Sequence, residues 1–541
     1  MLSGRNGKEA ATAPYGATTP ARDDVMALRD QVELLVRPGR QCLVPGAGEA
    51  LLREETGSGS GRIGKDAVTS AAGMRAVTRA ASGAAAPLPL LVSVNQEGGR
   101  LNAFDWPQVA QLPGSMALGA AGAEDLAEHA GAVTGGQLRA VGVTWNLAPV
   151  CDLAAWPSQS AVGTRAFGSD PDQVSRLVGA FVRGLQGAGV AATAKHFPGL
   201  GGVAVDPHHA APVVDELADG ALAPFRAAVR AGVACVMVGS HTVRAIEDRP
   251  ALASPRMITV LRDDLGFDGL VVSENLSIPA VHEPLGGLAH AAVAAVAAGV
   301  DLVMLDSEIS RGHQPHPRRV AAVHGRGEVV QALVDAVESG LIDRRRVAQA
   351  AARVLAVHRG FGITPTTRLP GWTRANEAAH QVADRVAKAS VAVVRGTHLL
   401  PLAEGARVAA VRVPDAGQRR ADSARHAPDL LPALLGAGYR LLAVPAGGNV
   451  PSDVETVVVY GYDTRTAAGD RSLAAAEAAR LTQQHQVVQV AFGDPDDLAD
   501  SPADVLIAAW SPHQASATAV FRVLSGQLRA RGTVPVQGAA W

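Results

Sequence analysis

The chain has 541 residues and a mass of 55.3 kDa, which is too long for one ordinary domain and suits two or three. Hydrophobic residues form 48% of it and charged residues 18%, so substantial cores can close and a wholly disordered protein is excluded. The 49 Lys and Arg nearly balance the 51 Asp and Glu, and the net charge of −2 argues against a nucleic acid or an anionic membrane as partner. Aromatic residues are only 4% of the chain.

Cysteine usage and the N-terminus predict a cytoplasmic protein. Cys42, Cys151 and Cys235 are widely spaced without a CxxC pair, which indicates neither a disulfide framework nor a zinc site. Residues 1–30 lack periodicity and the apolar core of a secretory signal, so we expect a disordered or extended tail. No His, Cys and carboxylate cluster has convincing ligand spacing, so the sequence implies no metal and no organic cofactor. Nothing in the sequence indicates the oligomeric state.

The longest apolar run, Leu288–Leu305, is mostly Ala and Val and contains His290 and Asp301. Such a run would partition poorly into lipid. It therefore predicts a buried helix that leads into a strand, and no membrane span.

Short apolar runs alternate with helix-length stretches through the first two thirds of the chain. Most runs open at Gly or Pro and end in polar residues, and the helical stretches carry apolar residues at three- and four-residue spacing. This alternation implies βαβ crossovers and a parallel sheet, and six or more units favour a (β/α)8 TIM-type barrel over residues 31–362. The runs are Pro87–Asn95, Gly142–Pro149, Gly189–His196, Gly232–His241, Gly269–Asn275 and Gly299–Asp306; the helical stretches include Ala123–Ala140, Pro171–Ala188, Leu222–Ala231 and His290–Ala298.

A smaller α/β sandwich domain is predicted for residues 386–541. It follows a linker and helix at 363–385, in which the Pro- and Thr-rich segment Ile363–Trp372 leads into a helical stretch, Asn376–Ser390. Its predicted strands are Arg407–Val413, Thr456–Tyr462, Gln486–Phe492 and Asp504–Trp510.

Polar residues gather where the predicted barrel strands end. In a parallel barrel these ends surround one mouth, where the active site is built, although any one of them could simply cap its loop. The groups are Asn95-Gln96-Glu97, Lys195-His196, Ser240-His241 and Ser273-Glu274-Asn275.

Three segments together carry a specific family pattern: VNQEGGRL (Val94–Leu101), AKHFPGLGGVAVDPHHAAP (Ala194–Pro212) and GFDGLVVSENLSI (Gly266–Ile278). In this order they resemble glycoside hydrolase family 3, particularly its β-N-acetylglucosaminidase branch, with its pattern DQEGGR, KHFPGHG followed by D-x-H, and SD near the end of a barrel strand. Supporting matches are PGSMALGAA, NLAPVCD, GTRAFGSDP and AGVDLV, and LSGQLRARGTVPV resembles the close of the family's second domain.

The resemblance implies a retaining mechanism in which one residue attacks the anomeric carbon and a second protonates the leaving oxygen and then activates water. The nucleophile position falls on Glu274, and the acid/base position on His208, steered by Asp206. His suits the double role because its pKa lies near working pH. The neighbouring His209 could compete for it, and the bland alternative is a turn capped by Asp206 with both histidines in solvent. The Gly-rich loop around this pair is consistent with a mobile catalytic loop.

The resemblance also implies that Lys195, His196 and Arg165 hold the hydroxyls of the sugar, with Asn95 in the same subsite. A buried ion pair is the structural alternative for Lys195. We expect Glu97 to organise the following Gly-Gly turn rather than to take part in chemistry.

This sequence departs from the family pattern at four positions. The family's first Asp is Asn95, an Arg is replaced by Ala103, the second His of KHFPGHG is Leu200, and the nucleophile Asp is Glu274. Loss of both an Asp and its Arg suggests compensated change, because a lone buried cation would be costly. The glycone therefore could differ from N-acetylglucosamine. Glu adds ~1.5 Å of reach over Asp, so either the pocket has moved back to fit or activity is low.

The leading hypothesis is a retaining exo-β-glycosidase of β-N-acetylhexosaminidase type that acts on a small soluble glycoside or amino-sugar conjugate. The alternatives are a glycoside phosphorylase or transglycosylase, since a neutral His admits phosphate, and a non-catalytic sugar-binding homologue. The shortage of aromatic rings argues against tracking of long polysaccharides. Trp106 and Trp145 are the nearest candidates for stacking on a sugar.

Overall fold

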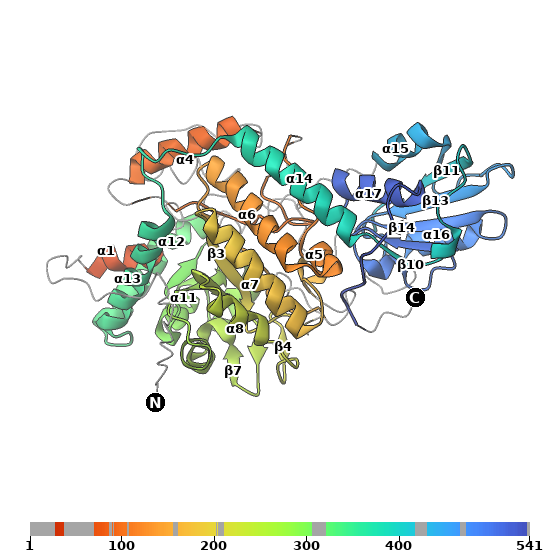
Figure 1. Ribbon diagram of the computed structural model, residues 1–541. Helices are drawn as coiled ribbons and strands as arrows, with labels where there is room; N and C mark the ends of the chain where they lie inside the picture. The colour runs from red at the N-terminus through yellow and green to blue at the C-terminus, as the bar shows by residue number, and fades with distance from the viewer. Residues whose placement is uncertain are drawn as a thin grey trace, which may run out of the picture.

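The computed structural model describes residues 28–36, 70–85, 89, 91–104, 106, 108–154, 161–201, 203, 210–305, 321–416, 430–465 and 472–537. The predicted tail therefore lies almost wholly outside the described residues. Two sheets organise these residues, each covered by helices, and the long helix α14 (Trp372–Ser390) runs from the first unit to the second (Figure 1). The predicted boundaries at 30, 362 and 385 stay predictions.

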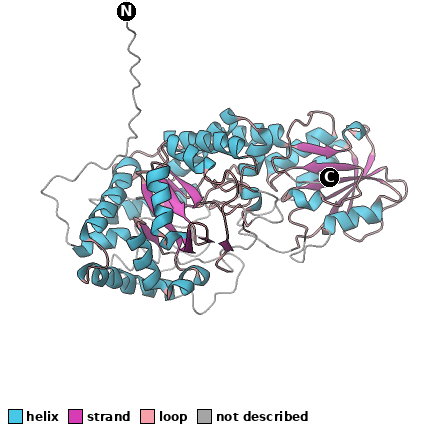
Figure 2. Cartoon of the chain, turned by 90° about the horizontal axis from the view of Figure 1, so that it is seen from below, coloured by secondary structure: helices cyan, strands magenta, loops and turns pink. Residues whose placement is uncertain are grey.

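The first sheet has six described strands, all parallel, in the order β1-β2-β3-β5-β8-β9. Five of the strands lie within the predicted runs, and β3 extends one residue beyond its run. The sheet curls inside a layer of helices (Figure 2), so the predicted (β/α)8-type fold class is confirmed. The strands are β1 (Ser93–Val94), β2 (Trp145–Asn146), β3 (Ala191–Phe197), β5 (Cys235–Val238), β8 (Leu270–Asn275) and β9 (Leu302–Met304).

Helices cover the outside of this sheet because their apolar residues recur on one face. In α7, for example, Val174, Leu177, Val178 and Phe181 are buried, and the helix begins where the side chain of Asp170 accepts the backbone N–H of Gln173 at 2.7 Å. The barrel helices are α4 (Ala71–Ala85), α5 (Ser115–Ala121), α6 (Glu124–Ala140), α7 (Pro171–Gly187), α8 (Ala223–Arg230), α9 (Pro255–Thr259), α10 (Pro279–His282), α11 (Leu288–Ala298), α12 (Ala321–Glu338) and α13 (Arg344–Phe361), with α1 (Leu28–Leu35) beside the last two.

Glycines allow α6 and α7 to pack backbone to backbone. A Cβ on Gly184 of α7 would lie 1.9 Å from the carbonyl oxygen of Glu128, and a Cβ on Gly131 of α6 would lie 2.3 Å from that of Phe181. Any larger residue would force the two helices apart and shift the strands they cover.

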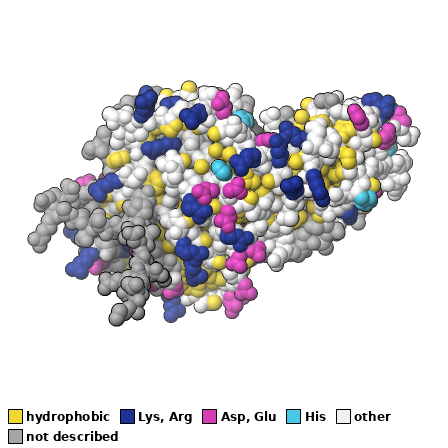
Figure 3. All heavy atoms as spheres, in the orientation of Figure 1, with side chains coloured by type: hydrophobic (Ala, Val, Ile, Leu, Met, Phe, Trp, Pro, Cys, Tyr) yellow, Lys and Arg dark blue, Asp and Glu magenta, His cyan; other side chains and the backbone are white. Residues whose placement is uncertain are grey.

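The apolar run 288–305 forms α11 followed by β9, as predicted. Among the helices in the described ranges, none is both long and apolar enough for a membrane span. On the face drawn in Figure 3, positive and negative side chains are interspersed.

The second sheet has the order β10-β15-β14-β13-β11-β12 and is parallel except at β10. Alternate residues of β13 point to opposite faces: Val458 and Tyr460 pack with α15 and α17, whereas Val457 and Val459 pack with α16. Helices thus cover both faces, and the predicted smaller α/β domain is confirmed. Its elements are β10 (Ala392–Arg395), β11 (Arg407–Arg412), α15 (Leu430–Gly438), β12 (Arg440–Pro445), β13 (Thr456–Gly461), α16 (Leu473–Leu481), β14 (Gln486–Ala491), β15 (Val505–Ala508) and α17 (Gln514–Leu524).

A third, small sheet was not predicted. It contains β4 (Val213–Val214), β6 (Thr242–Val243) and β7 (Glu247–Pro250), in the order β4-β6-β7. Because β6 follows β5 of the barrel, this sheet joins the carboxyl end of a barrel strand to the chain that returns from the segment after β3.

Candidate active site

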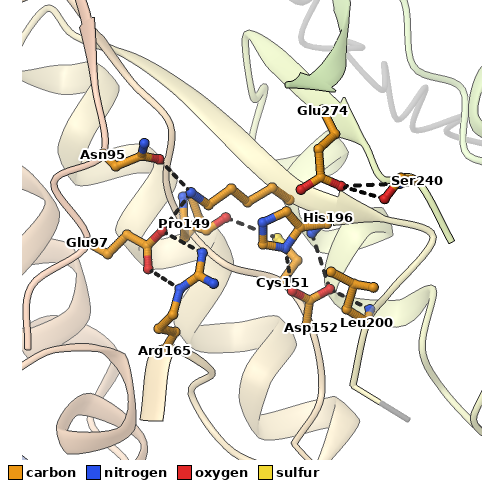
Figure 4. A network of polar contacts seen from close by, with 11 residues as sticks. Asn95, Glu97, Pro149, Cys151, Asp152, Arg165, His196, Leu200, Ser240 and Glu274 are labelled. Carbon is orange, nitrogen blue, oxygen red and sulfur yellow. Dashed lines mark hydrogen bonds and ion pairs between the residues drawn. The ribbon is translucent and has the colours of Figure 1, made fainter. Parts of the chain in front are cut away.

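The strand-end residues singled out from the sequence come together at the carboxyl ends of the barrel strands (Figure 4). Asn95 follows β1, Lys195 and His196 lie in β3, and Glu274 lies in β8. Arg165 joins them from a short 3-10 turn, Gly163–Arg165. The predicted convergence at one mouth is therefore observed for these five side chains.

Glu97 pairs with both cations of the site, Arg165 and Lys195. Its Oε2 accepts from Arg165 Nε at 2.8 Å, and its Oε1 accepts from Arg165 Nη2 at 2.9 Å and lies 2.6 Å from Lys195 Nζ. Burial raises the pKa of Glu97, but the two cations outweigh that effect and bring the pKa down to about 2. Glu97 is thus an anion at any physiological pH.

This arrangement bears on what was expected of Glu97 and Lys195. The Glu97 side chain does not organise the Gly-Gly turn; it binds the two cations expected to hold the sugar. The structural alternative considered for Lys195, a buried ion pair, is what the structure contains. Lys195 Nζ also donates to Asn95 Oδ1 at 2.8 Å. Since an ammonium has three donors, these two contacts leave one N–H for a further acceptor.

Burial lowers the pKa of Lys195, and the negative charges of Glu97 and, more weakly, Glu274 oppose that shift. Lys195 therefore lies within the electrostatic reach of both carboxylates. A hydroxyl placed between Lys195 and Glu274 would find a donor and an acceptor on opposite sides.

His196 is oriented by a residue that the sequence reasoning missed. Its Nδ1 lies 2.8 Å from Asp152 Oδ2, and Asp152 Oδ1 accepts the backbone N–H groups of His196 and Leu200 at 3.2 and 2.8 Å. Burial raises the pKa of Asp152, but His196 and these hydrogen bonds lower it overall. An ionised Asp152 accepts a hydrogen bond from the Nδ1–H of His196, and in a neutral imidazole held this way Nε2 is an acceptor. The motif NLAPVCD, which ends at Asp152, was the available signal.

Glu274 is held on one of its two oxygens. Its Oε2 accepts from the backbone N–H and the hydroxyl of Ser240, both at 3.2 Å, and the residue is 6% exposed. Ser240 follows β5, the neighbouring strand of β8. The second oxygen of Glu274, Oε1, is therefore the one that can face a bound sugar. Ser240 is a further site residue, which the sequence indicated only as the polar end of a strand.

His241 is an unusual buried group beside these residues. It is fully buried, and neither ring nitrogen makes a hydrogen bond of normal geometry. Burial lowers its pKa to about 4, and the negative charges of Asp152 and Glu274 offset the effect only in part. His241 is therefore neutral near pH 7, so it adds no charge beside Glu274.

The predicted acid/base pair, Asp206 and His208, and its competitor His209 lie outside the described residues. Both ends of their segment are described. On one side the Ala161 N–H donates to the carbonyl of Val203 at 2.8 Å, and on the other the Thr242 N–H donates to Pro212 at 2.9 Å. Thr242 opens β6 directly after Ser240 and His241, so the returning end is attached to the segment that holds Glu274.

The two tryptophans that were the nearest candidates for stacking on a sugar are both buried. Trp145 is 0% exposed in the barrel core, and its indole N–H donates to Thr193 at 2.7 Å. Trp106 is 4% exposed and packs between Phe104 and Trp372, with ring centroids 4.8 and 6.0 Å away. The site observed in the described residues is polar.

Cys151 and Cys235 are free and buried, and burial raises the pKa of both thiols. Cys42 lies outside the described residues. The described part of the chain contains no group of three or more His, Cys, Asp or Glu side chains arranged to hold a metal ion.

Glu274 and a set of charged and amide side chains thus gather at the mouth of a parallel barrel, where the active sites of such barrels are built. The family model described as "Glycosyl hydrolase family 3 N terminal domain" matches residues 59–357. The chain belongs to glycosyl hydrolase family 3 and is a glycoside hydrolase, as its motifs indicated.

Relatives and solved structures agree with this assignment. A "Beta-hexosaminidase" of Stenotrophomonas maltophilia (strain R551-3) is 38% identical over 237 residues, which cover 42% of this chain and 70% of the relative. A "Beta-N-acetylglucosaminidase/beta-glucosidase" of Cellulomonas fimi is 31% identical over 330 residues, 57% of this chain and 55% of the relative. The solved family 3 β-N-acetylglucosaminidase from Paenibacillus sp. str. FPU-7 has a TM-score of 0.73 and 28% identity, with 86% of this chain and 90% of that chain covered.

Proposed function

We propose that the protein is a retaining exo-β-glycosidase of β-N-acetylhexosaminidase type that removes a terminal sugar from a small soluble glycoconjugate. The observation that carries the proposal is the placement of Glu274, anchored by Ser240 on one oxygen, across from the Lys195–Glu97–Arg165 cluster. Relatives named β-hexosaminidase support the substrate class.

In the first step, Oε1 of Glu274, the oxygen that Ser240 does not bind, forms a bond to the anomeric carbon. At the same time the bond between the anomeric carbon and the leaving oxygen breaks. His208, protonated and steered by Asp206, gives its proton to that oxygen. In the second step, neutral His208 takes a proton from water, whose oxygen displaces Glu274 from the anomeric carbon. Two inversions retain the β configuration, and the enzyme returns with one water consumed.

Lys195, His196 and Asn95 bind the sugar and take no part in bond breaking. The remaining N–H of Lys195 and Nε2 of His196 are a donor and an acceptor, which is the pairing that adjacent sugar hydroxyls need. Asn95 accepts from Lys195 and carries no charge. A neutral amide there discriminates among glycones by hydrogen bonding alone.

The exo mode follows from the lack of ring platforms in the described site. Trp106 and Trp145 are buried, so extended subsites built on stacking have no support from them. A pocket that grips one terminal sugar through charged and amide groups fits a small substrate.

A panel of nitrophenyl β-glycosides, assayed with and without phosphate, tests the proposal. Hydrolysis of the N-acetylglucosaminide or a related glycoside, lost in Glu274→Gln and His208→Ala but kept in the matched control His209→Ala, supports it. Turnover that requires phosphate would assign a phosphorylase instead. Absence of turnover on every glycoside, with binding of the free sugar, would assign a non-catalytic sugar-binding homologue.

A further inference from the structure

The segment that carries Glu97 lies at the junction of the two units. We define the Glu97 loop as residues 96–103, which follow β1 and Asn95. The Glu97 side chain of this loop pairs with Lys195 and Arg165 in the candidate site. The Arg100 side chain points to the second unit, and Arg100 is only 3% exposed. One short loop therefore connects the candidate site with the second domain.

The loop is closed upon itself by side chains. Asn102 Nδ2 donates to the carbonyl of Gly99 at 2.8 Å, and Gln96 Nε2 donates to Asn102 Oδ1 at 3.0 Å. Gly98 and Gly99 have φ values of 84° and 60°, and a Cβ on Gly99 would lie 2.9 Å from the carbonyl oxygen of Pro113. These contacts tie Gln96, Gly99 and Asn102 together, so we expect a displacement at Gly99 or Arg100 to shift Glu97 as well.

Two side chains of the second domain hold the loop. Asp463 forms a buried ion pair with Arg100, whose guanidinium also lies 5.8 Å from the ring centroid of Tyr462. His513 Nε2 lies 2.8 Å from the Gly99 carbonyl oxygen and donates to it, because a carbonyl can only accept. Both contacts are buried, where such bonds are least weakened by water.

Asp463 and His513 come from the edge of the second sheet at which α/β domains bind ligands. Asp463 follows β13 and His513 follows β15, two strands of the parallel part of the sheet. Carboxyl ends of parallel strands are the usual ligand edge of an open α/β sheet. Here that edge binds the Glu97 loop of the barrel.

The backbone at this edge is strained. Asp463 has φ 48° and Trp510 has φ 67°, a left-handed conformation that non-glycine residues rarely adopt. The Trp510 indole N–H is tied to the carbonyl of Ser390 at 2.7 Å, and the backbone N–H of Asp494 donates to Asp463 Oδ1 at 3.4 Å. Such strain clusters where surrounding structure fixes a side chain for a function.

We propose that Asp463 and His513 are positioning residues of the glycosidase: they fix the Glu97 loop and thereby set Lys195 and Arg165 for the sugar. This inference rests on the proposed function for the role of the cluster. Neither residue touches the reacting atoms, so loosening the loop weakens sugar binding more than it slows bond breaking.

The test compares full-length Asp463→Asn, His513→Ala and His513→Gln with wild type. Gln can donate to the Gly99 carbonyl as His513 does, so it serves as the rescue variant. The matched control is Arg385→Ala, which breaks an exposed contact to Asp125 (3.4 Å) between α14 and α6, away from the loop. Hydrogen exchange of the peptide covering residues 95–104 and the kinetic constants on the best nitrophenyl glycoside are measured together.

We expect faster exchange at 95–104 in Asp463→Asn and His513→Ala, with kcat/KM reduced about tenfold, mainly through KM. Exchange and KM in His513→Gln and Arg385→Ala stay within about twofold of wild type. Unchanged exchange at 95–104, or faster exchange with KM unchanged, overturns the proposal. A fall in kcat alone overturns it as well.

If Asp463→Asn does not fold, the pair His513→Ala and His513→Gln decides by the same criteria. If wild type hydrolyses no glycoside, the proposed function fails on that result, whereas the positioning of the loop still stands or falls on the exchange rates, which need no substrate.

Discussion

Lys195 Nζ and Glu97 Oε1 form a buried ion pair of 2.6 Å, with the two side chains 3% and 2% exposed. Arg165 shares the same carboxylate, so one anion serves two cations. A buried cation without its partner is strongly unfavourable. The electrostatics of the candidate sugar site therefore depend on Glu97 more than on any other residue of the cluster.

Glu97→Gln should lower the stability of the protein. At pH 7 the free energy of unfolding falls by about 3–5 kcal/mol, because Lys195 and Arg165 lose their counter-charge. Urea unfolding of the two proteins measures the difference. A variant as stable as wild type would contradict the role of Glu97 as the counter-charge of Lys195 and Arg165.

The same comparison has a defined pH dependence. The pKa of Glu97 is about 2 in the folded protein and ordinarily 4.5, so the unfolded chain takes up its proton first as pH falls. The ionised Glu97 therefore stabilises the folded protein fully above pH 4.5. This contribution to the free energy of unfolding, on the order of 3 kcal/mol, is lost as pH falls toward 2. The difference in the free energy of unfolding between wild type and Glu97→Gln should therefore become smaller as pH falls from 4.5 to 2. A difference that does not depend on pH would contradict the low pKa of Glu97.

Asp152→Asn should reverse the hydrogen-bonding sense of His196. An amide would keep its oxygen on the backbone N–H groups of His196 and Leu200 and donate its N–H to Nδ1, so Nε2 must carry the proton. A donor would then face the hydroxyl that wild type meets with an acceptor. We expect kcat/KM to fall about tenfold or more, and ¹⁵N NMR of the His196 ring to report the changed tautomer; an unchanged tautomer would refute the reasoning.

His241→Leu should remove a pH dependence of stability. The folded pKa of His241 is about 4 against an ordinary 6.5, so the unfolded chain binds a proton that the folded protein refuses. Wild type consequently loses stability as pH falls from 6.5 to 4, on the order of 3 kcal/mol. Because neither ring nitrogen makes a hydrogen bond of normal geometry, we expect His241→Leu to lie within about 1 kcal/mol of wild type at pH 7.5 and to be the more stable protein at pH 4.5. Chemical unfolding at the two pH values is the measurement, and parallel pH profiles would contradict it.

The strands that were foreseen and those that were missed differ in burial. β13 and β14 are almost wholly buried, and apart from Gln486 and Gln489 of β14 their central residues are apolar, which is the pattern of central parallel strands. β12 is an edge strand with several exposed residues that ends at Pro445, and β10 is short and antiparallel at the other edge. Edge strands need no continuous apolar pattern and tolerate Pro, so the sequence carries little signal for them.

In the site, residues at strand ends were foreseen, and a buried ion pair was considered for Lys195, but the partners in the long-range ion pairs were not foreseen. Parallel topology alone brings Asn95, Lys195 and Glu274 to one mouth. The partners of Glu97 lie elsewhere in the chain, and the adjacent glycines pointed to a turn instead. Contacts such as Arg165 with Glu97 depend on tertiary packing, which has no local sequence pattern.

Asp301→Asn should destabilise the barrel and leave the candidate active site intact. Fully buried Asp301 precedes β9, at the amino end of the strands, and pairs with Arg262, Arg346 and Arg353 at 2.6, 2.7 and 3.2 Å. Without the carboxylate, three guanidiniums repel one another, and we expect a loss of about 3 kcal/mol in the free energy of unfolding. Because Glu274 lies at the opposite ends of the strands, kcat/KM per folded molecule should stay within about twofold. The matched control, Arg244→Ala, breaks an exposed pair and should change stability by no more than about 0.5 kcal/mol. A large fall in kcat/KM for Asp301→Asn would show that the two ends of the barrel are coupled.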